Sequence, residues 1–145
     1  ILRTKGSVVG VSSINGYRGT PARTAYTASK FAMNGFFESL RTEVMHRGVH
    51  ILVACPGFTG TNIRKAALKA DGTVQGDTPR NEEKMMTAEE VAQHIYKAVQ
   101  KRKRNIVLTT QGKLAVFLNK WMPGRMDEIV LNVFAKEPDS PFSKK

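Results

Sequence analysis

Ser7-Val8-Val9-Gly10-Val11-Ser12 is a short run of mostly apolar, β-branched residues. A run of this kind, without polar alternation, predicts a strand that is buried on both faces, as in a parallel sheet. A loop rich in Gly, Ser, Asn and Pro follows over residues 13–23, and segment 24–47 then spaces apolar residues as a helix does. A second apolar run occupies residues 49–55. Strand, helix and strand in this order predict a right-handed βαβ unit.

The helix predicted over residues 24–47 is free of proline, and Gly48 is a natural stop after it. One set of apolar positions recurs at helical spacing: Ala25, Ala28, Ala32, Phe36, Leu40 and Val44. A different face carries Phe36, Phe37 and Leu40. That face is interpreted either as core packing within the subunit or as a contact between two subunits.

The rest of the chain continues the alternation of helices and strands. Thr87 and Glu90 form a capping-box pattern, which predicts a helix with Thr87 as its N-cap. The apolar face of that helix is Val91, Ile95, Ala98 and Val99. Residues 105–109 predict a third strand. Residues 58–86 are polar and contain several glycines, so we expect a loop there, with a short helix over residues 62–70.

Residues 112–135 predict a pair of amphipathic helices that is interrupted at Pro123-Gly124. The first helix places Leu114, Phe117, Leu118, Trp121 and Met122 on one face, and the second places Met126, Ile129, Val130, Val133 and Phe134 on one face. With no repeat and no interdomain linker in the sequence, residues 1–145 are interpreted as part of a single α/β domain built on a parallel sheet.

Tyr26 and Lys30 lie four residues apart on the predicted helix, which puts them one turn apart on the same face. An ammonium beside a phenol favours the phenolate form, so the pair is a physically sensible device for proton transfer. Ser13 lies in the loop after the first strand, where its hydroxyl could donate a hydrogen bond to a substrate oxygen. The alternative for the pair alone is an exposed tyrosine beside a solvated lysine.

Three stretches around these residues occur in a characteristic order: Ser12-Ser13-Ile14-Asn15-Gly16, Ala25-Tyr26-Thr27-Ala28-Ser29-Lys30 and Pro56-Gly57-Phe58-Thr59-Gly60-Thr61. With them the chain closely resembles the short-chain dehydrogenase/reductase family, including the spacing between the serine and the tyrosine. The segment from Met86 to Phe142 resembles the hydroxysteroid-dehydrogenase-like branch of that family.

The resemblance implies a role for each of these residues. Tyr26 would be the general acid/base, Lys30 would support it and bind the nicotinamide ribose, and Ser13 would polarise the substrate carbonyl. Pro56, Gly57, Thr59 and Thr61 would also contact the cofactor. Tyr17 follows the stretch that contains Ser13 and could line a substrate pocket, although a surface aromatic is an equal alternative for it. The resemblance also implies an NAD(P)-dependent oxidoreductase that interconverts a ketone and a secondary alcohol of an apolar substrate by hydride transfer.

The resemblance also identifies what this chain does not contain. The family's glycine-rich nucleotide-binding turn and its catalytic asparagine have no match in these 145 residues. We therefore expect the chain to supply the last three strands of a Rossmann-type doubly wound parallel sheet, with residues 58–86 as the substrate loop. The choice between NAD and NADP is left open, and we expect this piece alone to bind either cofactor poorly. A non-catalytic relative or truncated product that acts by association is the alternative.

The formal net charge of +11 permits binding to phosphate-rich ligands, nucleic acid or an anionic membrane surface. A solvated basic face is the competing interpretation, because the basic residues are scattered apart from residues 101–104. Nucleic acid is not an expected partner, since basic and aromatic residues do not interleave and no binding motif is present. His46, His50 and His94 lack ligand spacing, so no metal site is expected.

Cys55 is the single cysteine and cannot form an internal disulfide, which fits a reducing compartment. No apolar run approaches the roughly 20 residues that a membrane helix needs. We therefore expect a cytoplasmic protein, with peripheral membrane contact through the C-terminal helices as an open alternative. Trp121 with Lys113, Lys120 and Arg125 would suit such a helix, whereas packing on the protein body or on a second subunit is the competing explanation. We expect the full-length protein to form a homo-oligomer.

Overall fold

The computed structural model describes residues 1–63, 66, 68, 72–74, 76, 85–136 and 140–143. The elements in chain order are β1 (Ser7–Val11), η1 (Ile14–Gly16), α1 (Thr24–Val44), η2 (Met45–Arg47), β2 (His50–Cys55), α2 (Ala88–Gln100), β3 (Asn105–Val107), α3 (Thr110–Trp121) and α4 (Pro123–Ala135). The short helix predicted over residues 62–70 lies largely outside the described residues.

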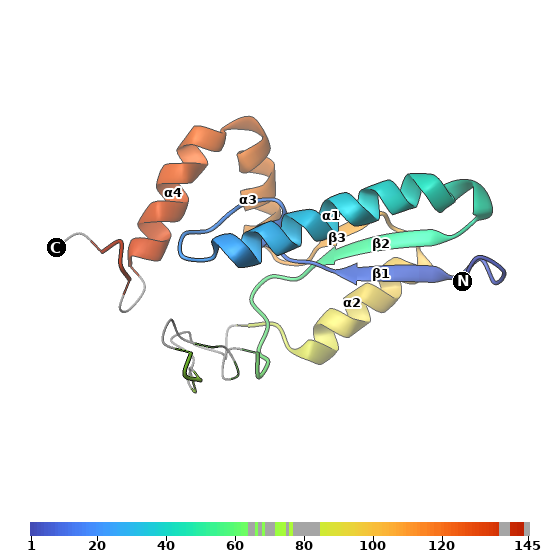
Figure 1. Cartoon of the computed structure of the whole chain (residues 1–145), viewed down its shortest axis with the longest axis horizontal. Helices are drawn as coiled ribbons and strands as arrows, with labels where there is room; N and C mark the ends of the chain where they lie inside the picture. The colour runs from blue at the N-terminus through green and yellow to red at the C-terminus, as the bar shows by residue number, and fades with distance from the viewer. Residues whose placement is uncertain are drawn as a thin grey trace.

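Three parallel strands form the sheet in the order β1-β2-β3. In register, Val9 lies opposite Leu52 and Ala54 lies opposite Ile106. Helix α1 covers one face of the sheet and α2 covers the other, while α3 and α4 stand beyond the ends to which the strand arrows point (Figure 1). The predicted α/β class, parallel sheet and three strands are therefore confirmed.

The hydrophobic core is centred on β2, the middle strand. All six residues of β2 are buried, because strands lie on both sides and helices lie above and below. The buried apolar side chains are Val49, Ile51, Leu52, Val53, Ala54, Cys55, Val91, Ala98 and Met126. Two faces predicted from the sequence contribute to this core: the Val91–Ala98 face of α2 and Met126 of α4.

Strand β1 is less buried than its sequence predicts. Ser7 and Val11 are exposed, Val8 and Val9 are half-buried, and only Gly10 is buried. The exposed fraction of Val11 is 50%. Within the described part of the chain, β1 has β2 as its single neighbouring strand, so its other edge is free. The prediction of a strand buried on both faces is therefore wrong for this chain, although the strand itself is present.

The two apolar faces predicted for α1 are each buried only in part: Phe37, Leu40 and Val44 are half-buried. Ala25, Ala28 and Ala32 are exposed, and Phe36 is 62% exposed. The half-buried Phe37 instead lies on the backbone of β1 at Gly10, where an added Cβ would come within 2.3 Å of the Phe37 ring. Phe37 therefore packs on the sheet, as the core-packing alternative for the face of Phe36, Phe37 and Leu40 requires.

Helix ends follow local capping chemistry. The predicted capping box is present: Thr87 Oγ1 accepts from Glu90 N at 3.1 Å, and Glu90 Oε2 accepts from Thr87 N at 2.9 Å. The third strand ends at Val107, two residues earlier than predicted, because Thr109 is the N-cap of α3 and accepts from Gly112 N at 3.0 Å. Gly48 ends η2 with a φ of 76°, as a glycine stop requires.

Arg41 connects α1 to the sheet from a buried position. Its guanidinium donates to the backbone oxygens of Ile51 (3.3 Å) and Arg104 (3.1 Å) and to Asn105 Oδ1 (3.0 Å). Desolvation by burial lowers the pKa of Arg41, and the nearby charge of Arg104 lowers it further. Three acceptors around one cation join the helix to β2 and to the start of β3.

Candidate active site

The site forms at the carboxyl ends of β1 and β2, where the loops after two adjacent parallel strands meet. Ser12 and Ser13 follow β1, and Pro56 and Gly57 follow β2. Ser12 N donates to Ala54 O at 2.7 Å, which holds the two strand ends together. In open α/β sheets, ligands bind in the crevice outside these strand ends.

Ser13 is held as the N-cap of the short helix η1. Its Oγ accepts a hydrogen bond from Asn15 N at 3.2 Å. A hydroxyl has one proton and two lone pairs, so this contact uses a lone pair and leaves the proton for another acceptor. The local structure therefore aims Ser13 as a donor.

Tyr26 and Lys30 lie on the first turns of α1, as predicted. The Lys30 Nζ atom is 5.5 Å from the centre of the Tyr26 ring, and it donates to Val11 O at 3.2 Å. The second contact fixes the ammonium at the carboxyl end of β1. Tyr26 is 43% exposed.

Two asparagines that the sequence analysis did not single out organise the loop between Ser13 and Tyr26. Asn15 Nδ2 donates to Thr20 Oγ1 (2.7 Å) and Thr27 Oγ1 (3.3 Å), which joins the loop to α1. Asn34 Nδ2 donates to Gly16 O at 2.9 Å. A Cβ at Gly16 would lie 2.5 Å from the Asn34 amide, so the close approach needs glycine. The Asn-Gly dipeptide at 15–16 was a visible turn signal, but its partners on α1 were not readable from the sequence.

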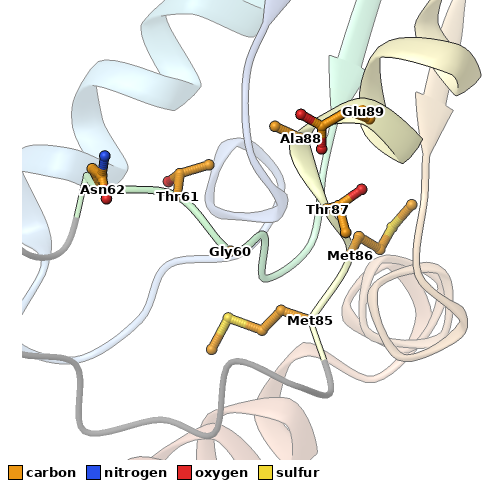
Figure 2. A pocket seen from close by; sticks show the side chains of 8 residues that line it. All are labelled: Gly60, Thr61, Asn62, Met85, Met86, Thr87, Ala88 and Glu89. Carbon is orange, nitrogen blue, oxygen red and sulfur yellow. The ribbon is translucent and has the colours of Figure 1, made fainter.

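The predicted cofactor-contacting residues after β2 form a turn and one wall of a cavity. Thr59 Oγ1 donates to Gly57 O at 3.2 Å, and Gly60 N donates to Met86 O at 2.9 Å. Thr61 lies with Gly60 on one side of a cavity of about 410 Å³, and Thr87 and Glu89 of the α2 start lie on the other (Figure 2). Gly57 passes so close to Thr109 that a Cβ would lie 2.4 Å from its methyl group.

Tyr17 is half-buried beside the site. Desolvation by burial raises the pKa of its phenol, and the charges of Cys55, Arg41 and Glu38 act on it as well. These groups belong to β2 and α1, so the ring lies towards the body of the protein. A role for Tyr17 in a substrate pocket stays a prediction.

Cys55 is fully buried at the end of β2. Burial raises the pKa of its thiol to about 11, although the Ser12 hydroxyl, the Ser13 backbone and the Lys30 charge act in the opposite direction. A protonated, enclosed thiol is a poor nucleophile. Cys55 is therefore a packing residue beneath the loop that follows β1 (residues 12–23), which we call the serine loop.

The C-terminal helices are tied to the serine loop by three side chains, which we call the Arg18 cluster: Arg18, Asn119 and Asp127. Arg18 Nη1 donates to Asn119 Oδ1 at 3.0 Å, and its Nη2 forms an ion pair with Asp127. Asn119 Nδ2 in turn donates to Tyr17 O at 3.0 Å. These contacts span about a hundred residues of sequence, and no local pattern signalled them.

The site residues thus come together in two groups. Ser13, Tyr26 and Lys30 share the loop and helix that follow β1, whereas Pro56, Gly57, Thr59 and Thr61 follow β2. Among the residues described by the structure there is no group of three His, Cys, Asp or Glu side chains able to hold a metal ion. The same residues include no helix long and apolar enough to cross a membrane.

Comparison with known proteins gives consistent matches. The family model for short chain dehydrogenases matches residues 1–72. The Mus musculus protein named dehydrogenase/reductase SDR family member 7B is 36% identical over 144 residues, which cover 99% of this chain and 45% of the mouse protein. A Dictyostelium discoideum dehydrogenase/reductase SDR family protein 7-like is 33% identical over 133 residues, 92% of this chain and 40% of that protein.

Solved structures share the fold. A short chain dehydrogenase from Burkholderia cenocepacia in complex with NADP superposes with a TM-score of 0.72 at 15% identity, covering 90% of this chain and 49% of that one. A short-chain dehydrogenase from Sphingobium yanoikuyae in complex with NADPH has a TM-score of 0.59 at 15% identity. The match covers 96% of this chain and 49% of that one.

This chain spans less than half the length of the curated relatives it matches. The family model matches the region that contains the serine loop, the tyrosine–lysine pair and the turn after β2, and the 7B relatives match nearly the whole chain. The chain belongs to the short-chain dehydrogenase/reductase family, in the branch of the member 7B proteins.

Proposed function

We propose that this chain carries the proton-transfer residues of an NAD(P)-dependent oxidoreductase that interconverts a ketone and a secondary alcohol. The observation that supports the proposal is that Ser13, Tyr26 and Lys30 follow β1 together: the Ser13 hydroxyl keeps its proton, Tyr26 is partly exposed, and the Lys30 ammonium is fixed on Val11 O. These are the three groups that polarising and protonating a carbonyl oxygen require.

The residues present fit the nicotinamide half of the cofactor. Lys30 bonds to Val11 O at the end of β1, and the Pro56–Thr61 turn follows the end of the neighbouring strand β2. The close passage of Gly57 against Thr109 keeps the turn compact, and Thr61 lines the adjoining cavity. Tyr26, Lys30, Pro56, Gly57, Thr59 and Thr61 would hold the nicotinamide and its ribose.

When bound, the reduced nicotinamide supplies a hydride to the carbonyl carbon. Ser13 would donate its hydroxyl proton to a hydrogen bond with the carbonyl oxygen and so polarise the carbonyl group. Tyr26 would transfer its phenolic proton to that oxygen as negative charge develops there. Lys30 has three N–H donors and uses one on Val11 O, so two stay available for a ribose hydroxyl and for stabilising the phenolate.

The C-terminal helices would form part of the substrate enclosure. The Arg18 cluster fixes α3 and α4 against the loop that carries Ser13. Apolar side chains on this helix pair stay exposed, including Phe117 and Trp121. We propose a small apolar carbonyl or alcohol as substrate. The substrate loop expected over residues 58–86 lies in part outside the described residues.

Two surfaces would be covered in the full-length protein. The exposed face of α1, with Phe31 and Phe36, would pack in a homo-oligomer. The stripe of Leu114, Phe117 and Trp121 on α3, with Lys120 Nζ 5.8 Å from the centre of the Trp121 ring, would make peripheral contact with a membrane surface or pack on a second subunit.

The proposed function is tested in the full-length protein with a panel of apolar ketones and either reduced nicotinamide cofactor. Cofactor oxidation should depend on ketone, and Ser13→Ala should lower kcat by about 10²-fold or more while cofactor affinity stays unchanged. Ser39→Ala, which changes an exposed serine further along α1, serves as the control. Absence of turnover with every ketone, or full activity of Ser13→Ala, would refute the proposal.

A further inference from the structure

A second hollow, distant in the sequence from the serine loop, lies between α2, β3 and the start of α3. Its volume is about 370 Å³. The lining side chains are His94, Lys97, Ala98, Lys101, Lys103 and Lys113, with β3 and Leu108 forming one wall. We call this hollow the lysine groove.

Four lysines from three segments line the lysine groove. Lys97 lies on α2, Lys101 and Lys103 lie in the turn before β3, and Lys113 lies on α3. No carboxylate lines the groove, and the one ion pair found among the described residues is that of Arg18 with Asp127. Like charges gathered around a hollow repel one another, and an anionic occupant would relieve that repulsion.

The wall of the groove is also an open sheet edge. β3 pairs with β2 on one side, and no strand pairs with its other side in the part of the chain that the structure describes. Arg104 O and Leu108 N bond to β2. Successive strand residues direct their backbone groups to opposite edges, so Asn105 and Val107 present N–H and C=O groups to the free edge.

These two features together specify the occupant. We propose that the lysine groove binds an extended acidic segment of a partner protein, which adds to the sheet as a strand alongside β3. The backbone of the segment would bond to Asn105 and Val107, and carboxylates on alternate residues would meet the lysines. Main-chain hydrogen bonds provide affinity in this mode of recognition, and side-chain pairing provides specificity.

Other occupants satisfy fewer of these features. A second copy of this chain would bring the same four lysines against each other, which opposes edge-to-edge pairing. A small phosphate would neutralise the lysines but leave the strand edge unpaired. Any strand that continues the sheet beyond β1 joins at the opposite edge, so it leaves the groove open.

The test is binding of a fluorescently labelled peptide of alternating Glu and Val residues to the full chain, measured by anisotropy at two salt concentrations. We expect saturable binding that weakens as salt rises. Lys97→Glu/Lys103→Glu should weaken binding at least about tenfold. Arg3→Glu/Arg125→Glu, which changes the net charge equally at exposed positions away from the groove, should leave it within about twofold. Circular dichroism verifies that both variants are folded.

A second peptide separates strand addition from simple charge attraction in the unaltered protein. Methylation of its alternate backbone nitrogens leaves its charge the same but removes the donors that β3 would need. We expect this peptide to bind at least about tenfold more weakly, and amide NMR shifts from the unmethylated peptide to include Asn105 and Val107. Equal binding of both peptides, full competition by inorganic tripolyphosphate, binding only to anionic vesicles, or no binding would each overturn the proposal.

Discussion

The Arg18 cluster is the point at which the C-terminal helices meet the serine loop, and Arg18→Ala should loosen their docking there. The Arg18 side chain is 16% exposed and donates to Asn119 at 3.0 Å. A hydrogen bond from a charged group of this kind contributes about 1.5–3 kcal/mol. Its other partner, Asp127, is 71% exposed, so solvent limits that ion pair to about 1 kcal/mol or less. Because Arg18→Ala removes both contacts, we expect the docking of α3 and α4 to lose about 2 kcal/mol.

Hydrogen exchange of the α3 and α4 amides measures this loss directly. A loss of about 2 kcal/mol in helix docking corresponds to about 30-fold faster exchange in these helices. The β2 amides should be unaffected, because the core strand does not depend on the cluster. Arg125→Ala, an exposed arginine on α4, is the matched control and should change exchange by less than about twofold. The reasoning is refuted if the α3 and α4 amides exchange no faster in Arg18→Ala than in Arg125→Ala.

Two further predictions concern the core and the exposed helix stripe. Burial raises the pKa of the Cys55 thiol to about 11, from about 9 in the unfolded chain. Between pH 9 and pH 11 the unfolded thiol therefore loses its proton before the folded one does. The free energy of unfolding should be unaffected by Cys55 at neutral pH and should fall over that range. Urea titrations from pH 9 to pH 11 should show this fall for the unaltered protein, and Cys55→Ala should remove it. A free energy of unfolding that stays constant in the unaltered protein over this range would contradict the prediction. Phe117→Ala/Trp121→Ala in the full-length protein should weaken sedimentation with anionic vesicles at least about tenfold, since each side chain contributes about 1.5–3 kcal/mol on burial. Failure of the unaltered protein to sediment would reject membrane contact.

Features set by local chemistry could be predicted from the sequence. The β2 run is apolar throughout and forms the central strand, and Thr87 with Glu90 forms the expected capping box. The positions of Ser13, Tyr26 and Lys30 in the loop and first helix turns followed from strand and helix order. Each of these depends on residues within a few positions of one another.

Features set by contacts between distant segments could not be predicted. The sequence left open whether the face of Phe36, Phe37 and Leu40 packs within the subunit or between subunits, and the contact of Phe37 with Gly10 depends on how α1 lies on β1. The Arg18–Asn119 bond joins segments whose proximity depends on how α3 and α4 fold back. The exposure of β1 depends on which strands surround it rather than on its own composition.

The central claim is that Tyr26 transfers the proton to the substrate oxygen, and one measurement tests it most directly. Single-turnover cofactor oxidation by full-length Tyr26→Phe should be slower by about 10²–10⁴-fold than by the unaltered enzyme, because the ring is kept and only the transferable proton is lost. Cofactor affinity, measured on the same samples by fluorescence titration, should stay within about threefold. A Tyr26→Phe enzyme that turns over at the unaltered rate would contradict the account.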